Sequence, residues 1–288
     1  MEFSFLNIRF YLLIAAGLLA SCTRELDIEL PSSATQLVVE GRIETGSPPV
    51  VLLSRSSSFY DDFILDSAAN YFVSGAHIVV SDGTDSVILA EVFIDTAGVS
   101  IPVYVGFGFL GQEGKTYQLR IKVEGKVLRA VTSIPKALPL DSLWWETMPE
   151  SDTLVRLLCR FTDPPEPENY VRYFTKRNAE PFMPGFNSVF EDDLVNGQSF
   201  DFPLDRGVDR NNPETFEHYG LFYRGDTITV KWCAIDAAHF EFWRTLEFEL
   251  GGQGSPFAAP VIIKSNIEGG LGIWGGYAPS YHQLIVPR

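Results

Sequence analysis

Short segments in which apolar and polar residues alternate dominate the chain from about residue 36 onward. Alternation with a period of two is typical of a β-strand that has one buried and one solvated face. The clearest segment is Tyr117 to Val123, where Tyr, Leu, Ile and Val alternate with Gln, Arg and Lys. The following Glu124-Gly125 turn leads into another alternating segment, so the sequence predicts a β-hairpin.

The segments around this hairpin have the same character and are separated by Gly, Asp, Ser or Pro. They predict strands at Gln36 to Ile43, Val50 to Ser54, Ala76 to Ser81, Ser86 to Phe93, Ser100 to Val105 and Val127 to Thr132. With the first strand of the hairpin they make seven, which favours a β-sandwich over residues 36–135.

A domain boundary is predicted in Ser133 to Leu140, because Pro135 and Pro139 cannot donate to a strand ladder. A second β-rich domain is expected over residues 141–288. Its strands are predicted at Leu154 to Phe161, Tyr170 to Lys176, near Phe200, Leu221 to Tyr223 and Asp226 to Ile235. The expected fold is therefore all-β, with two β-sandwich-like domains in tandem.

The C-terminal domain is expected to carry one helix at residues 236–250, with Asp236 as N-cap and Gly251-Gly252 at its end. Apolar residues at near-helical spacing should pack on a sheet, and these are Phe240, Trp243, Leu246 and Leu250. Charged residues expected on the outer side are Glu241, Arg244 and Glu247.

The N-terminus differs from the rest, because an unbroken apolar run from Phe10 to Ala20 ends in the lipobox Leu19-Ala20-Ser21-Cys22. Such a run makes about 16 Å of helix, roughly half of a hydrocarbon core. It therefore predicts a signal peptide at residues 1–21, lipid such as palmitate on Cys22, and a polar tether at residues 22–35. An ordinary secretory signal cleaved elsewhere is the alternative.

Composition and charge narrow the possible partners. Hydrophobic residues make up 45% and charged residues 20% of the chain, as in core-forming globular proteins. The formal net charge of −15 repels phosphate backbones, which argues against a nucleic-acid partner. An export compartment would permit a disulfide between Cys159 and Cys233, although strand alternation places only Cys159 on an apolar face, so a bridge and two separate thiols both stay open.

Residues that could carry chemistry form no recognisable motif. No His-Glu-x-x-His, Cys-x-x-Cys or Gly-x-Ser-x-Gly pattern occurs, so we expect no metal site, no cofactor and no catalytic residue. The histidines, which we expect to pack or to face solvent, are His77, His218, His239 and His282. Loop carboxylates that could form a glycosidase pair or a calcium site, but are more often simply solvated, are Glu191, Asp192, Asp193, Asp201, Asp205 and Asp209.

Gly270 to Gly275 matches the Gly-x-Gly-x-x-Gly dinucleotide pattern, but only 13 residues follow it. That length is too short for the rest of a βαβ unit. We expect instead a strand whose glycines make a bulge or admit close aromatic approach, with Ile273, Trp274 and Tyr277 supplying the packing.

This tail also carries a family resemblance. Residues 265–277 read Ser-Asn-Ile-Glu-Gly-Gly-Leu-Gly-Ile-Trp-Gly-Gly-Tyr, which resembles the ending of a Bacteroidota lipoprotein family catalogued as domain of unknown function 4249. Shorter similarities lie at Leu37 to Gly41, Gly114 to Tyr117, Ile134-Pro135, Asp141-Ser142 and Gly254 to Phe257. The resemblance implies an outer-membrane lipoprotein, often found beside TonB-dependent transporters, with no established catalytic residues.

We therefore expect a non-enzymatic, lipid-anchored envelope protein that is an accessory or ligand-binding partner of a TonB-dependent β-barrel transporter. The alternatives are a structural subunit of an envelope assembly and a carboxylate-based glycan hydrolase. Candidate contacts for a partner or ligand, with core packing as the competing role, are Phe59, Tyr60, Phe63, Phe107 and Phe109. Acidic residues after Cys22 favour the cell surface over the periplasmic face, and these are Glu25, Asp27 and Glu29.

Overall fold

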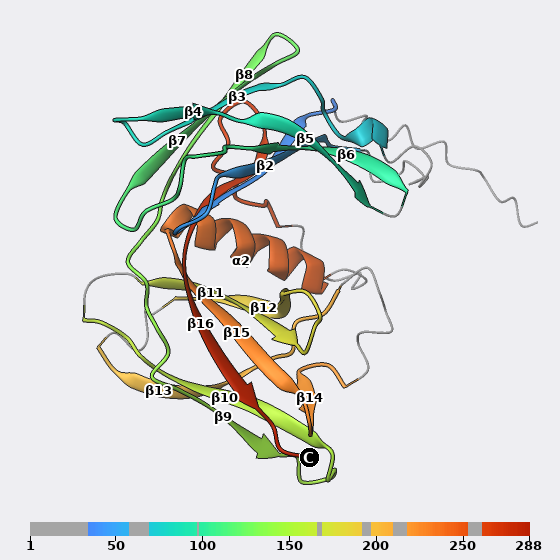
Figure 1. The fold of residues 1–288 in the computed structure, drawn as a ribbon, viewed down its shortest axis with the longest axis vertical. Coiled ribbons are helices and arrows are strands. Elements are labelled where there is room, and N and C mark those ends of the chain that lie inside the picture. The colour runs from blue at the N-terminus through green and yellow to red at the C-terminus, as the bar shows by residue number, and fades with distance from the viewer. Residues whose placement is uncertain are drawn as a thin grey trace, which may run out of the picture. The chain divides into compact units, whose positions relative to one another are not determined.

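A central sheet of eight strands joins segments from both ends of the chain in the computed structural model (Figure 1). The structure describes residues 34–57, 69–96, 98–165, 169–191, 197–209, 218–252 and 261–288. Residues 35–288 make one compact unit. In sheet order, the central strands are β12 (Met183–Glu191), β11 (Tyr170–Arg177), β15 (Thr227–Ile235), β16 (Leu271–Ile285), β1 (Leu37–Glu44), β2 (Val50–Arg55), β6 (Val99–Val105) and β5 (Ala90–Thr96).

Two smaller sheets pack on one face of the central sheet. One consists of β4 (Ser86–Ile88), β3 (His77–Ser81), β7 (Thr116–Val123) and β8 (Lys126–Ser133), and its buried residues share a core with β1 and β2. The other consists of β13 (Ser199–Leu204), β10 (Leu154–Thr162), β14 (Leu221–Tyr223) and β9 (Ser142–Thr147), and it shares a core with β11 and β15. Strand alternation produces both cores, since every second residue of a strand faces the same side.

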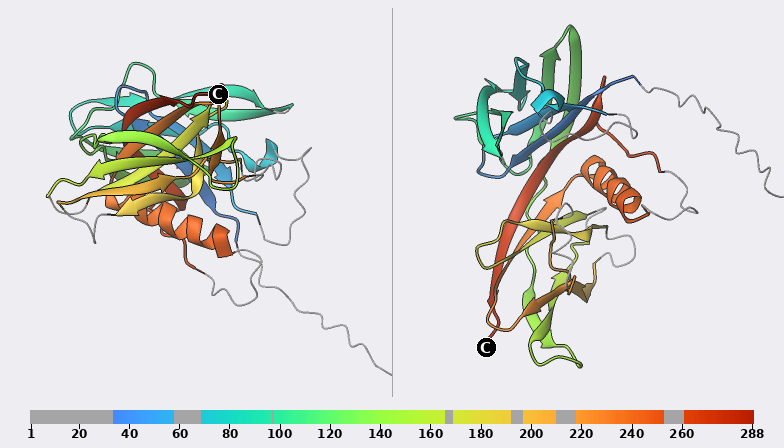
Figure 2. Two further views of the ribbon diagram at one scale, coloured as in Figure 1. Left: turned by 90° about the horizontal axis from the view of Figure 1, so that it is seen from below. Right: turned by 90° about the vertical axis from the view of Figure 1, so that its right-hand side faces the viewer.

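The helix α2 (Ala237–Gly252) packs on the opposite face, beside the long strand β16 (Figure 2). Phe240 of this helix is buried against Cys233 and Ile235 of β15. Trp232, which precedes Cys233 in the same strand, belongs to the core on the other side of the sheet. The sequence predicted this helix and its N-cap. The cap is confirmed, because the Asp236 carboxylate accepts a hydrogen bond from the His239 N–H at 2.9 Å. Within the described ranges no helix is long and apolar enough to span a bilayer.

The predicted all-β class with a single long helix is confirmed, and most predicted strands lie within two residues of their observed bounds. One predicted strand, Ser86 to Phe93, is divided at Leu89, which is buried and donates its N–H to the Ile78 carbonyl at 2.9 Å. Strands β9 and β12 were not predicted. Consecutive apolar residues hide the alternation of β9, and Pro184 lies inside β12, where the register with β11 shifts.

The two halves share β16. Its residues Leu271 to Tyr277 pair in parallel with β1, and Ala278 to Ile285 pair antiparallel with β15. The core beside β1 and β2 includes Ile267 and Trp274 from the C-terminal part of the chain, and the central sheet runs through both sandwich-like parts. The division into tandem domains at residues 36–135 and 141–288 stays a prediction.

The glycines of β16 allow close approach, as expected from the sequence. A Cβ atom on Gly275 would lie 2.3 Å from the His239 ring, and one on Gly41 of β1 would lie 2.7 Å from the Trp274 ring. Both rings are buried. The glycines of the tail thus serve packing between strands and between sheet and helix.

We expect Gly275→Ala to destabilise the protein by about 1–3 kcal/mol, because the added methyl group would overpack the buried His239 ring. Urea unfolding measures the change. Gly251→Ala is the matched control, since a Cβ at Gly251 in α2 meets nothing within 4 Å. Equal stability of the Gly275→Ala variant and the wild type would contradict the close approach of helix and sheet.

Candidate functional site

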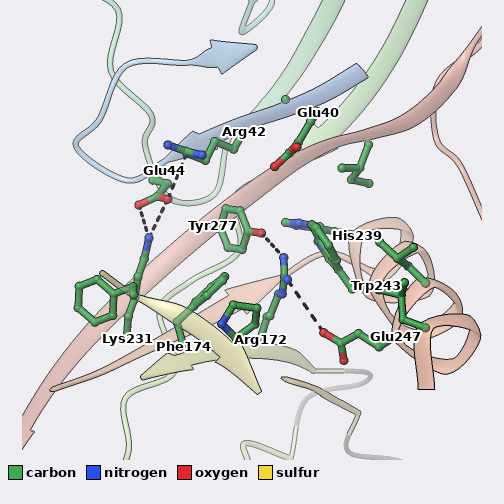
Figure 3. Close-up of a pocket in the computed structure, with 16 residues that line it drawn as sticks. Glu40, Arg42, Glu44, Arg172, Phe174, Lys231, His239, Trp243, Glu247 and Tyr277 are labelled. Carbon is green, nitrogen blue, oxygen red and sulfur yellow. Dashed lines mark hydrogen bonds and ion pairs between the residues drawn. The ribbon is translucent and has the colours of Figure 1, made fainter. Parts of the chain in front are cut away.

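A cavity of about 450 Å³ lies between α2 and the central sheet (Figure 3). Charged side chains from β1 line one side of it. Aromatic and aliphatic side chains line the rest, together with Arg172 of β11, Lys231 of β15 and Glu247 of α2. The volume lies within the usual range for small-molecule sites. We call this cavity the central pocket.

Strand β1 contributes a row of charges to the central pocket. Glu40, Arg42 and Glu44 alternate with the residues that face the core, so all three lie on the pocket face (Figure 3). Glu40 and Arg42 are exposed, and Glu44 is half-buried. The sequence placed these residues on the polar face of a strand, and only the structure places a pocket over them.

Arg172 of β11 is the most enclosed cation of the pocket, with 4% of its surface exposed. Its Nη1 donates to the Tyr277 hydroxyl at 2.9 Å, and its Nε donates to the Ser188 hydroxyl at 3.2 Å. The guanidinium carbon lies 3.4 Å from the centroid of the Trp243 ring, in a cation–π contact. Planar stacking and directed hydrogen bonds fix this side chain in one position.

Glu247 of α2 compensates the charge of Arg172. Its carboxylate oxygen lies 4.0 Å from the Arg172 Nη2, and it accepts hydrogen bonds from the N–H and hydroxyl of Ser188. The prediction that Glu247 faces outward is wrong, since it is only 6% exposed. It lies seven residues after Phe240, almost two full turns, and therefore on the same inner face of the helix.

A second ion pair joins β15 to β1. The Lys231 Nζ lies 2.7 Å from both carboxylate oxygens of Glu44, and both side chains are largely shielded from solvent. Burial alone would lower the pKa of Lys231, but Cys233 and Glu44 raise it above its ordinary value. The Arg42 Nε is 3.9 Å from Glu44, beyond hydrogen-bond distance.

His239 lies at the base of α2 and is 1% exposed. Burial first, and then the positive charge of Arg172, lower the pKa of His239 to about 3. Its Nδ1 lies 3.2 Å from the Gly276 carbonyl oxygen, so a neutral ring with the proton on Nδ1 satisfies that oxygen. At neutral pH this histidine is a packing residue, one of the two roles expected from the sequence.

Phe107 and Phe109, the predicted partner contacts that the structure describes, do not line the central pocket. Phe107 is 64% exposed, whereas Phe109 packs edge-on against Tyr117 with ring centroids 5.9 Å apart. The remaining candidates lie outside the described residues, and these are Phe59, Tyr60 and Phe63. Cys22 also lies outside them.

Two of the carboxylates that the sequence placed in loops lie on strands, Glu191 at the end of β12 and Asp201 in β13. Asp201 forms an ion pair with Arg160 at 2.6 Å, and Asp205 accepts a hydrogen bond from the Tyr219 hydroxyl at 3.0 Å. Asp192 and Asp193 lie outside the described residues. Nowhere in the described part of the chain do three His, Cys, Asp or Glu side chains gather as they would around a metal ion.

The two cysteines are separate thiols. Cys159 and Cys233 are both buried, and they belong to different cores on opposite faces of the central sheet. Burial raises the pKa of Cys233 to about 12, so the thiol stays protonated at neutral pH. Of the two alternatives that the sequence left open, the structure therefore shows the unbridged one.

Comparison with known proteins agrees with the resemblance seen in the sequence. The model of the family described as "Domain of unknown function (DUF4249)" matches residues 23–282. No curated protein matches the chain. The matched region contains every residue that lines the central pocket.

We expect Glu247→Gln to lower the free energy of unfolding by about 3–5 kcal/mol, because it leaves the charge of Arg172 buried without compensation. The matched control is Glu241→Gln on the same helix, which breaks an exposed ion pair with Arg244 and should cost less than about 1 kcal/mol. Urea unfolding of both variants tests the difference. Similar losses of unfolding free energy in the two variants would mean that the buried pair contributes no more to stability than the exposed one.

Stability should also depend on pH through His239. Between pH 6.5 and about 3 the unfolded chain binds a proton at His239 that the folded protein excludes, so stability falls as the pH falls through this window. At pH 5 the loss is about 2 kcal/mol relative to pH above 7. His239→Gln should remove this part of the slope in urea unfolding, whereas the exposed control His77→Gln should retain it. If the unfolding free energy of His239→Gln depended on pH as steeply as that of the wild type, the low pKa of His239 would be contradicted.

Proposed function

We propose, from the premise that this chain belongs to the DUF4249 family, that it is a non-enzymatic ligand-binding protein of the cell envelope. Lipid on Cys22 would anchor it to the outer membrane, and its working partner would be a TonB-dependent β-barrel transporter. The observation that carries the binding role is the central pocket, with its charged row on β1 and its apolar side chains away from that strand.

The organisation of the pocket supports recognition rather than acid–base chemistry. The enclosed charges are engaged in pairs, Arg172 with Glu247 and Lys231 with Glu44. His239, with a pKa of about 3, does not change its protonation near neutral pH. Such pairs fix the walls in advance, which lowers the cost of ordering the site when a ligand binds.

The anchor supports a partnership at a membrane. The compact unit begins at Thr35, so the residues between Cys22 and Thr35 would form the tether. Confinement to the membrane plane raises the effective concentration of a weak binder beside a transporter. Display on the cell surface is the favoured orientation in this proposal.

A pull-down of the full-length lipidated protein in mild detergent tests the partnership. We expect an outer-membrane β-barrel transporter to co-elute with the wild type. Cells grown with labelled palmitate should incorporate the label into the protein. Cys22→Ser should abolish labelling and membrane association, and reduce co-elution at least tenfold, because the tether concentrates the partners. Ser32→Ala in the tether is the matched control and should behave as the wild type.

The outcomes separate the alternatives. Elution of the lipidated protein without any β-barrel would contradict the transporter partnership, and co-elution with other envelope machinery would favour a structural subunit. Membrane association that survives Cys22→Ser would overturn the anchor.

A further inference from the structure

Two charged side chains at the entrance of the central pocket are available to a ligand. Glu40 is exposed and makes no ion pair within the described ranges. The Arg42 side chain is 56% exposed. Its Nε lies 3.9 Å from the Glu44 carboxylate, too far for a hydrogen bond, so Arg42 donates none to Glu44 through this contact. Glu44 itself is already occupied by Lys231.

The backbone spacing of these two residues gives the scale of a ligand that could reach both side chains. Glu40 and Arg42 are two positions apart on one face of β1, which separates their Cα atoms by about 6.6–6.8 Å along the strand. A single amino acid carries its ammonium and carboxylate on the same carbon. Two extended residues span up to about 7 Å, which matches the spacing on β1.

Away from β1, apolar side chains line the pocket beside the enclosed Arg172, Lys231 and Glu247. Partly exposed ones among them are Phe174, Phe182, Pro184, Leu246 and Leu250. Such side chains favour a ligand with a large apolar group, because contact with them removes apolar surface from water.

The charge balance of the pocket favours a ligand without net charge. Three carboxylates, Glu40, Glu44 and Glu247, face three cations, Arg42, Arg172 and Lys231, while His239 is neutral. The lining is thus balanced within a protein of net charge −15. A zwitterion matches this balance, whereas an anion would meet the long-range repulsion of the whole protein.

We propose that the central pocket binds a dipeptide-sized molecule with free ends and a large apolar side chain. Glu40 binds the ammonium group, Arg42 binds the carboxylate, and the apolar side chains of the pocket receive the side chain of the ligand. Recognition is through side chains, because β1 is paired on one edge with β16 and on the other with β2 and offers no free backbone edge. This inference rests on the proposed binding role of the same pocket.

Isothermal titration of the full chain in detergent with leucyl-phenylalanine tests the proposal. We expect the dipeptide to bind at least tenfold more tightly than leucine alone. Glu40→Gln and Arg42→Gln should each weaken binding about tenfold or more, because each removes a charge-assisted hydrogen bond. Glu146→Gln and Arg120→Gln, on exposed positions of β9 and β7, are matched controls and should leave binding unchanged.

Blocked ligands identify which end each residue binds. The N-acetyl dipeptide should bind weakly and be insensitive to Glu40→Gln, and the C-terminal amide should be insensitive to Arg42→Gln. Because both positions are exposed, thermal unfolding should show that these variants are folded.

Equal binding of free and blocked dipeptides, or wild-type affinity of both variants, would overturn the proposal. Absence of dipeptide binding, together with retained transporter co-elution and another small molecule released from the purified protein, would refute this ligand class and leave the proposed function standing. Peptide binding without any transporter partner would support the ligand class and count against the partnership.

Discussion

The pairing of β16 with two strands from opposite ends of the chain is the constraint on which the structure depends. Leu271 to Tyr277 complete the sheet beside β1, and Ala278 to Ile285 complete it beside β15. One strand thereby makes a continuous sheet from two halves, and each half carries its own small sheet on the same face. The opposite face is left for α2, and the central pocket lies between that helix and the sheet.

A glycine of β16 and the charged residues of α2 together determine how closely the helix packs on the central sheet. Without a side chain at Gly275 the His239 ring packs directly on β16, and the Asp236 carboxylate ties the start of α2 to β8 through the Ser133 N–H at 2.8 Å. Further along the helix, Glu247 lies beside Arg172. Buried pairs of this kind are costly to break, so they fix the position of the helix more than they add to stability.

The same arrangement distinguishes structural charges from available ones. Arg172, Glu247, Lys231 and Glu44 are enclosed and paired with one another, whereas Glu40 and Arg42 remain at the entrance. The outer charges are solvent-exposed rather than enclosed, and Arg42 lies 3.9 Å from Glu44 without a hydrogen bond to it, so a dipolar ligand is the kind that the proposed site would orient. In the proposed binding role the pocket's apolar side chains would add affinity, and the His239 ring, with a pKa of about 3, stays neutral near pH 7.

Local patterns in the sequence determined most strands, the capped helix, the packing role of the tail glycines and the family, because alternation, capping and glycine content act over a few neighbouring residues. They missed β9 and β12, which lack regular alternation. The sequence also determined that Glu40, Arg42 and Glu44 share one face of a strand. Only the tertiary structure decided that this face borders a pocket, that Glu247 is buried, and that β16 pairs with β1 more than 200 residues earlier. Such pairings depend on which surfaces remain to be covered once the whole chain has folded, and no local pattern encodes that.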